Sequence, residues 1–264
     1  MTTFAEYAAL PGINWSRLKL MAKSPLHFRE EVIGDSDPMS FGRAAHCTVL
    51  EPLEFPRLYV LWDGGTKRGK AWDKFCEANA GKYPLSERDY NRAVAVRDAV
   101  LNDPVAGSYF TGPGESEVTL QWTDAGTGLN CKARLDRSLP GTVVDLKTAA
   151  DAGPDAFARA AARYQYAHQM AHYCMGANYA YGAEHRAVIV AVESEAPHDV
   201  CVYELSEDDL WTAGEEVKAL LRRVKECMAS GQWPGRFTEP QTLDLPPYAF
   251  ARDDSELELT GGSK

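Results

Sequence analysis

A short apolar segment, residues 143–147, constrains the fold of this chain more than any other stretch. Its sequence, Val-Val-Asp-Leu-Lys, has the composition and length of a strand buried in a sheet. Side chains alternate between the two faces of a strand, so Asp145 and Lys147 point the same way. Burying a carboxylate and an ammonium is costly unless the two groups act together. The segment predicts a functional charged pair in a buried sheet, and the plainer alternative is a solvated ion pair at a strand end.

A second carboxylate, Asp136, lies one short loop upstream of this segment. Residues 138–141, Ser-Leu-Pro-Gly, contain the proline and glycine of a turn. If the strands on either side of this turn pair with each other, Asp136 and Asp145 converge. Two carboxylates beside Lys147 form a site for a hard cation that prefers oxygen ligands, with a charged helper next to it.

Apolar periodicity and turn residues predict a sheet in the second half of the chain and helices around it. We expect strands at residues 115–122, 129–136, 143–147, 186–193 and 199–205. We expect a first helix that starts within residues 12–16 and ends at Ser24. We expect further helices at residues 40–50, 86–101, 154–181 and 206–228, and one more that starts after residue 70. Residues 35–38 are expected to form a loop, and residues 253–264 a mobile tail.

The composition is that of an ordinary globular protein. The 264 residues suit one large domain or two small ones, and 45% of them are hydrophobic. No apolar run is long enough to predict a transmembrane helix, and the first residues lack the pattern of a signal peptide. The six cysteines are scattered without a C-x-x-C pair. This spacing predicts reduced thiols in a cytoplasmic protein and argues against an iron–sulfur or zinc site.

The formal net charge of −10 argues against a broad basic surface for nucleic acid, although a narrow basic channel is compatible with it. The densest positive cluster is a glycine-rich loop at residues 63–70, which carries Lys67, Arg68 and Lys70. The loop lacks the spacing of a Walker A motif. It is either a phosphate-contacting loop or a flexible solvated one.

Several other polar residues stand out in apolar surroundings. His46 lies within the apolar helix predicted at residues 40–50. Taken alone, this position favours a buried core histidine whose hydrogen bonds are made within the protein. Tyr166, Gln169 and Tyr173 fall on one face of their predicted helix. Their polar tips indicate that this face borders something polar, and an aromatic core stripe is the alternative.

Charged residues also alternate along two of the predicted strands. Glu115 and Glu117 share one face of their strand, so either side chain could face the acidic site, or both could be solvated. Lys132 and Arg134 share one face of the next strand, which indicates a partly wet or ligand-facing surface.

Taken in order, these pieces resemble the PD-(D/E)XK nuclease superfamily and, within it, the RecE-like phage exonucleases of the exodeoxyribonuclease VIII type. The resemblance covers roughly residues 13–233, and its joint order and spacing are more specific than any single piece. The matching pieces are residues 15–19 with Ser24-Pro25, 41–46 leading to 50–52, 66–72, 132–136, 144–148, 166–173 and 192–193 before Pro197.

The resemblance implies a role for each matching residue. Asp136 and Asp145 would bind Mg²⁺ or Mn²⁺ with help from the Leu146 carbonyl, and Lys147 would orient the attacking water. His46 resembles a metal-contacting histidine of RecB-type nuclease domains, which reverses its interpretation as a core residue. The remaining implied members are Glu117 as an extra acidic residue, Gln169 and Tyr173 as the helix motif beside the site, and Tyr166, Lys67, Arg68 and Lys70 as DNA contacts.

We therefore expect an α/β fold with a restriction-endonuclease-like core, in which helices flank a central mixed sheet. A single nuclease domain would span residues 1–235, mostly helical over 1–110 and catalytic over 111–235, with residues 236–264 as a partly mobile extension. The resemblance implies a Mg²⁺-dependent exonuclease that resects double-stranded DNA ends 5′→3′. It also implies a RecT-like annealing partner, a ring-shaped oligomer and a role in phage recombination.

Three rival hypotheses stay open from the sequence, and the plainest of them is an acidic α/β protein whose motif match is fortuitous. The first is an endonuclease or repair nuclease of the same fold, although the scattered cysteines argue against the iron–sulfur type. The second is a non-catalytic DNA-binding or protein-binding member of the fold. The intact Asp136, Asp145 and Lys147 argue against the second hypothesis.

Overall fold

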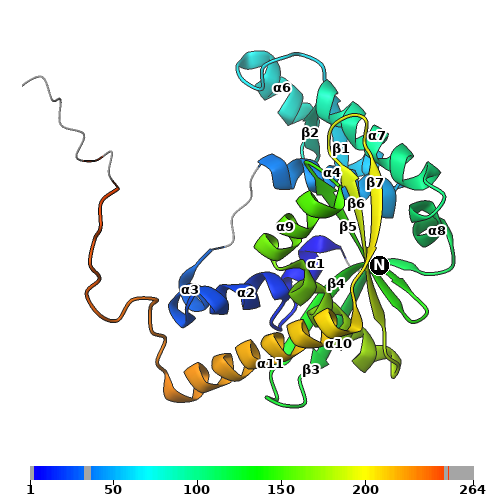
Figure 1. Cartoon of the computed structure of the whole chain (residues 1–264). Helices are drawn as coiled ribbons and strands as arrows, with labels where there is room; N and C mark the ends of the chain where they lie inside the picture. Colours follow the sequence, from blue (N-terminus) through cyan, green and yellow to red (C-terminus); the bar gives the residue numbers. More distant parts are fainter. Residues whose placement is uncertain (1–2, 33–36, 247–248, 250–264) are drawn as a thin grey trace, which may run out of the picture.

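A mixed five-stranded sheet forms the centre of the molecule (Figure 1). The computed structural model describes residues 3–32, 37–246 and 249. The strand order is β3-β4-β5-β6-β7, in which β5 and β6 are parallel and the other neighbours antiparallel. The strands are β3 (Glu115–Thr123), β4 (Asn130–Leu139), β5 (Thr142–Ala149), β6 (Arg186–Glu193) and β7 (Val200–Glu204). All five strands predicted from the sequence are present, and so is the mixed sheet.

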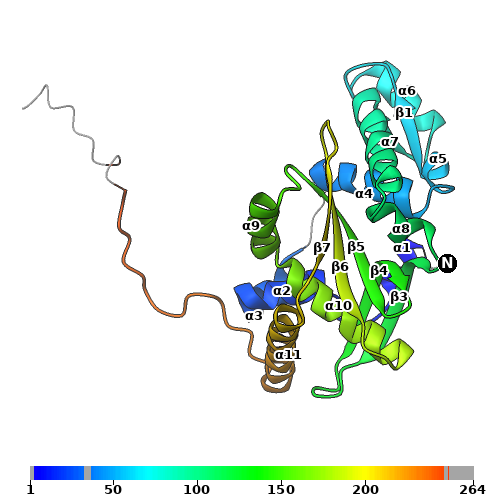
Figure 2. The same ribbon diagram turned by 45° about the vertical axis from the view of Figure 1, so that its right-hand side comes forward.

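Helices cover both faces of this sheet (Figure 2). The covering helices are α2 (Trp15–Lys23), α10 (Tyr166–Tyr181) and α11 (Glu207–Ser230) on one face, and α4 (Asp37–Leu50) and α7 (Glu87–Asn102) on the other. Val143 and Ile189 pack against the first group, whereas Leu146 and Val190 pack against the second. The alternation predicted for residues 143–147 is therefore present, and β5 and β6 are buried on both faces because their interiors are apolar.

A smaller lobe is built between α4 and α7, and of its elements only the helix that starts at Lys70 was predicted. It consists of α5 (Phe55–Leu58), β1 (Tyr59–Trp62), α6 (Lys70–Ala78) and β2 (Tyr83–Ser86), and β1 and β2 pair in parallel. Phe55, Tyr59 and Leu85 form its core with small residues of α4 and α7. The two strands have only four residues each, and Pro84 within β2 makes its sequence look like a loop.

Three short helices also escaped the sequence prediction, because six residues are too few to show helical periodicity. They are α1 (Phe4–Ala9), α3 (Pro25–Glu30) and α8 (Ala106–Thr111). Among the helices that the structure describes, none is both long and apolar enough to cross a membrane.

The single helix predicted at residues 154–181 was wrong. The chain forms two helices, α9 (Pro154–Tyr164) and α10, because Gln165 adopts a left-handed backbone with φ 60° and ψ 46°. No glycine or proline marks this break in the sequence.

Two smaller boundaries also differ from the prediction. The turn after β4 is shorter than expected, since Ser138 and Leu139 still pair with β5. Asp37 and Pro38 belong to α4 and not to a loop, while residues 35–36 and the tail at 253–264 lie outside the described residues.

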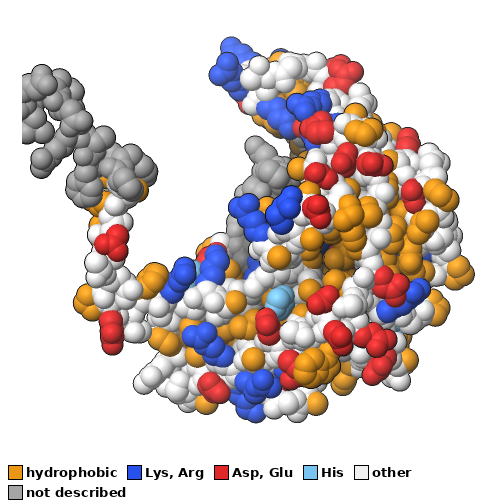
Figure 3. Space-filling view, viewed as in Figure 1, with side chains coloured by type: hydrophobic (Ala, Val, Ile, Leu, Met, Phe, Trp, Pro, Cys, Tyr) orange, Lys and Arg blue, Asp and Glu red, His pale blue; other side chains and the backbone are white. Residues whose placement is uncertain are grey.

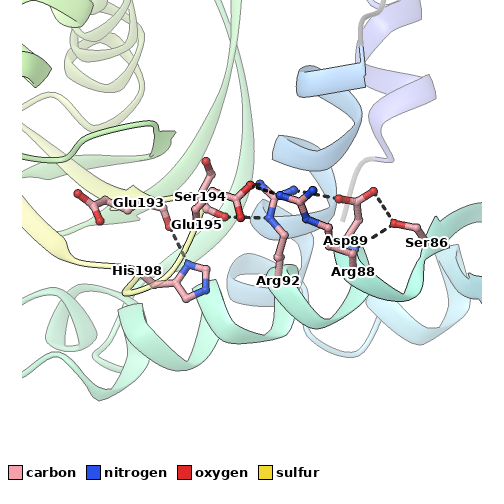
Figure 4. A network of polar contacts seen from close by, with 8 residues as sticks. All are labelled: Ser86, Arg88, Asp89, Arg92, Glu193, Ser194, Glu195 and His198. Atoms are coloured by element: carbon pink, nitrogen blue, oxygen red, sulfur yellow. Dashed lines mark hydrogen bonds and ion pairs between the residues drawn. The ribbon is translucent and has the colours of Figure 1, made fainter.

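A network of polar contacts ties the helical part of the chain to the turn between β6 and β7 (Figure 4). Arg92 on α7 donates from Nε to the Ser194 carbonyl at 3.0 Å and pairs with Glu195 at 3.0 Å. Its guanidinium also lies 4.0 Å from the ring centroid of Phe41 on α4. The helices on this face are therefore fixed to the sheet next to the end of β6.

Candidate active site

The paired part of β4 and β5 ends at the Arg137–Val144 pair, and the candidate site lies where pairing stops. Beyond this pair, the Leu146 N–H donates to the side chain of Asp136, at 2.8 Å from Oδ2, and not to a backbone carbonyl of β4. His46 on α4 places Nδ1 3.5 Å from the same oxygen. The end of the ladder thus brings Asp136 next to β5 and to the predicted histidine.

Asp145 and Lys147 extend from β5 on the same side, as strand alternation predicts, and form an ion pair through Asp145 Oδ2 and Lys147 Nζ. The Asp145 side chain is only 1% exposed. Lys147 Nζ also lies 4.9 Å from the ring centroid of Tyr166 on α10. Burial alone would lower the pKa of Lys147, but the charges of Asp145 and Asp136 outweigh it and raise the pKa. The lysine is therefore a cation at neutral pH.

The carboxylates of the site carry more negative charge than their neighbours balance. Burial, followed by the charge of Asp145, raises the pKa of Asp136 to about 7. Burial, followed by the charge of Asp136, raises the pKa of Glu117 to about 7. A bound cation would stabilise the ionised form of both groups, so the charge of this site suits a metal ion.

The donor set fits a hard divalent ion better than a soft one. Among the described residues, no three His, Cys, Asp or Glu side chains form a ready-made metal cage. Mg²⁺ does not require such a cage, since it is usually held by one or two carboxylates and keeps several waters. Asp136 and Asp145 supply these carboxylates, and the metal contacts of His46 and of the Leu146 carbonyl stay predictions.

Glu117 lies beside this centre because of an irregularity in β3. Its backbone has φ 56°, and it drops out of the ladder between the Ser116–Arg137 and Val118–Leu135 pairs. Its carboxylate forms an ion pair with Arg134, whose Nη2 lies 3.8 Å from Glu51 Oε2. Glu117 is the acidic residue of β3 that faces inward, whereas Glu115 is exposed.

Arg134 and Glu51 were not predicted as members of the site. Arg134 was noted only as one of two cations that alternate on a strand. The other, Lys132, does not face a ligand, since its Nζ donates to the carbonyls of Tyr7, Ala8 and Leu10 at 3.0, 3.0 and 2.6 Å. Lys132 thus caps the end of α1. The sequence pattern treats Lys132 and Arg134 alike, and their side-chain contacts in the structure show that Arg134 is the one that faces the site.

The face of α10 predicted to border something polar does border the site. Gln169 Nε2 donates to the Tyr173 hydroxyl at 2.8 Å. Burial, followed by the charges of Asp145 and Asp136, holds the pKa of Tyr173 well above its usual value. Tyr173 is therefore a neutral hydroxyl that can donate a hydrogen bond near the carboxylates.

The basic loop predicted to contact DNA lies on the small lobe, next to α6. Lys67, Arg68 and Lys70 are exposed there. Lys67 Nζ donates to the Pro84 carbonyl at 3.0 Å and lies 5.9 Å from the Trp72 ring centroid. Among the described residues, no contact joins this loop to the carboxylates, so it is a separate surface at the end of the molecule (Figure 1).

The family of the chain follows from comparison with known sequences. The model of a family described as "PDDEXK-like domain of unknown function (DUF3799)" matches residues 14–244. The chain belongs to this DUF3799 family. The predicted membership of the PD-(D/E)XK superfamily is therefore confirmed, whereas the finer likeness to RecE-type exonucleases stays a prediction. The comparison with curated proteins found no match.

Comparison with solved structures supports the fold of this DUF3799 protein. The crystal structure of a "Putative exonuclease" from Eubacterium rectale superposes with a TM-score of 0.64 at 16% identity, covering 98% of this chain and 99% of that chain. The structure of SSO0001 matches with a TM-score of 0.26 at 19% identity, over 47% of this chain and 62% of that chain. At 16% identity the first match establishes the shared fold alone, and the second is too distant to support any argument.

Proposed function

We propose that this protein is a metal-dependent nuclease that hydrolyses phosphodiester bonds at the ends of double-stranded DNA. The observation that carries the proposal is the buried cluster of Asp136, Asp145 and Lys147 at the point where β4 and β5 stop pairing. Two carboxylates with unbalanced charge and one lysine held as a cation are the groups that phosphodiester hydrolysis requires. Membership of the DUF3799 family supports the same chemistry.

Each described side chain has a distinct task in this proposal. Asp136 and Asp145 would hold Mg²⁺ or Mn²⁺, which when bound neutralises phosphate oxygens and lowers the pKa of the attacking water. Lys147, fixed by Asp145 and by the Tyr166 ring, orients this water and stabilises the charge that develops on the phosphorus oxygens. Gln169 holds the Tyr173 hydroxyl in position beside the carboxylates.

The finer parts of the proposal are supported by the sequence resemblance to RecE-like exonucleases. They are digestion from ends in the 5′→3′ direction, a RecT-like annealing partner, a ring-shaped oligomer and a place in phage recombination in the cytoplasm of a bacterial cell. The Eubacterium rectale protein of the same fold carries the name "Putative exonuclease". Contacts of Lys67, Arg68 and Lys70 with the DNA backbone belong to this part of the proposal.

The test compares linear and closed circular duplex DNA, each with Mg²⁺ or with EDTA. We expect the native chain to degrade only the linear DNA, and we expect EDTA and Lys147→Ala to abolish degradation. Lys218→Ala is the matched control, because Lys218 is exposed on α11 and, among the described residues, forms its ion pair with Glu215 alone. Release of label from the 5′ end before the 3′ end would support the proposed polarity.

The other outcomes separate the rival functions. Cutting of the circle would replace the exonuclease with an endonuclease. Retention of DNA without cleavage of either form, at every metal concentration, would contradict catalysis and favour a binding protein.

A further inference from the structure

The break between α9 and α10 places two tyrosines against each other beside the candidate site. Tyr164 and Tyr166 are two residues apart, so in one continuous helix their side chains would point to different sides. Because Gln165 adopts a left-handed backbone, the rings instead stack with centroids 5.8 Å apart and planes inclined by 26°. The residue that interrupts the helix is thus the residue that builds the aromatic pair.

This pair forms a row that runs from the buried lysine of the site to solvent. Lys147 Nζ lies 4.9 Å from the ring centroid of Tyr166, and Phe157 supports the same ring at a centroid distance of 5.9 Å. Tyr164 stands at the outer end of the row and is 53% exposed. A ring that stays half exposed contributes little to the core, so packing does not explain why it stacks here.

Positive charge surrounds the outer end of the row. The Arg163 guanidinium carbon lies 5.6 Å from the Tyr164 ring centroid, and Arg159 is one turn away on the same helix. Both arginines are exposed, and Figure 3 shows basic side chains over α9 on the concave side of the molecule. An exposed aromatic ring next to an exposed guanidinium is suited to a stacked base and its phosphate.

We propose that Tyr164 is a stacking platform for one base of the strand that is cut, with Tyr166 as its support. Arg163, which lies over the ring in the absence of DNA, would move to the adjacent phosphate. A base that stacks on Tyr164 has left its neighbour in the duplex, so the platform favours frayed ends and single-stranded overhangs over intact duplex. This inference rests on the proposed nuclease function and adds a recognition element to it.

The test measures kcat/KM on a DNA end with normal nucleotides and on ends with one abasic nucleotide, moved position by position around the cut. Stacking on an aromatic ring contributes enough affinity that Tyr164→Ala should lower kcat/KM about tenfold on normal DNA. An abasic nucleotide at one position should lower kcat/KM of the native protein by a similar factor. The same nucleotide should lower kcat/KM of Tyr164→Ala no further. Tyr164→Phe should stay within about twofold of the native protein, since it keeps the ring.

Two controls separate this recognition from folding and from the reaction itself. Tyr179→Ala removes another exposed tyrosine, 63% exposed on α10, and should change nothing. An oligonucleotide of tetrahydrofuran abasic residues, a phosphodiester chain without bases or other aromatic rings, should be hydrolysed equally by the native protein and by Tyr164→Ala. Equal loss on normal and abasic DNA, equal loss on this base-free chain, or no loss at all would each overturn the inference.

A binding measurement keeps the inference testable if the nuclease proposal fails. Quenching of 2-aminopurine at the end of a DNA overhang is measured with Ca²⁺ in place of Mg²⁺. We expect the native protein and Tyr164→Phe to quench the probe and Tyr164→Ala to leave it bright. Equal quenching by Tyr164→Ala would overturn the platform, whereas quenching by the native protein in Ca²⁺ together with no cleavage by it in Mg²⁺ would contradict only the nuclease.

Discussion

Two clusters of charged residues lie beside the same sheet, and they are built in opposite ways. In the network of Figure 4, Arg88 and Arg92 face Asp89 and Glu195, so the charges balance. Arg88 is 72% exposed and pairs with Glu195 at 2.8 Å, in contact with water. This network links α7 to the β6–β7 turn, and its arrangement suits a structural role.

The site around Asp136 has no such balance. Four carboxylates, those of Asp136, Asp145, Glu117 and Glu51, lie beside the cations of Lys147 and Arg134, and all six side chains are largely buried. The pKa of Asp136 is raised to about 7 by burial and then by Asp145, which indicates a charge that the protein alone does not compensate. Excess buried charge of one sign is tolerated where a ligand supplies the opposite charge, so the contrast supports the proposed metal-binding role of the site.

The largest expected effect is on kcat, which should fall after a substitution in the acidic site and not after the same substitution in the balanced network. Asp145→Asn keeps the shape of the side chain and removes both a metal ligand and the partner that fixes Lys147. We expect kcat on linear DNA to fall by about 10³-fold or more, the loss typical of a preorganised electrostatic group. Asp89→Asn, the same change in the balanced network, should leave kcat within about twofold. Comparable losses in both variants would remove the distinction between the clusters.

The second effect is on stability and depends on pH. The pKa of Asp136 in the folded, metal-free protein is about 7, above its ordinary value of 3.8, so the folded state binds the proton more tightly than the unfolded state. Stability therefore decreases as pH rises from about 4 through 7. Asp136→Asn lacks this titration and should be more stable than the native chain at pH 8 by about 2 kcal/mol.

Thermal unfolding in EDTA at pH 5.5 and pH 8 measures this difference. Mg²⁺ should raise the melting temperature of the native chain more at pH 8 than at pH 5.5, because the ion binds the ionised carboxylates. A melting temperature of Asp136→Asn that stays below that of the native chain at pH 8 would contradict the unbalanced charge.

Much of this site was accessible from the sequence, because strand alternation is a local property. It places Asp145 and Lys147 on one side of β5, and a short turn suffices to return Asp136 to the same region. The choice of Glu117 over Glu115 required the structure, since φ 56° at Glu117 breaks the alternation that treats the two glutamates alike. No residue type at that position announces such a backbone.

The parts that were missed depend on distant contacts. Gln165 interrupts a stretch without glycine or proline, and the break lets Tyr166 pack on Phe157 and Lys147. The two strands of the small lobe were missed because β1 and β2 have four residues each and, among the described strands, pair with each other alone. Lys132 and Arg134 alternate on one strand, yet one caps α1 and the other faces Glu117.

The smallest expected effect lies within the balanced network and tests whether its two arginines are equivalent. Arg92 is 19% exposed, donates to the Ser194 carbonyl and lies over Phe41, so Arg92→Ala should lower the free energy of unfolding by about 1–2 kcal/mol. Arg88→Ala removes an exposed ion pair and should cost less than about 0.5 kcal/mol. Urea unfolding of the two variants under the same conditions measures this difference. A loss of nuclease activity in Arg92→Ala, compared at equal amounts of folded protein, would place this network with the acidic centre.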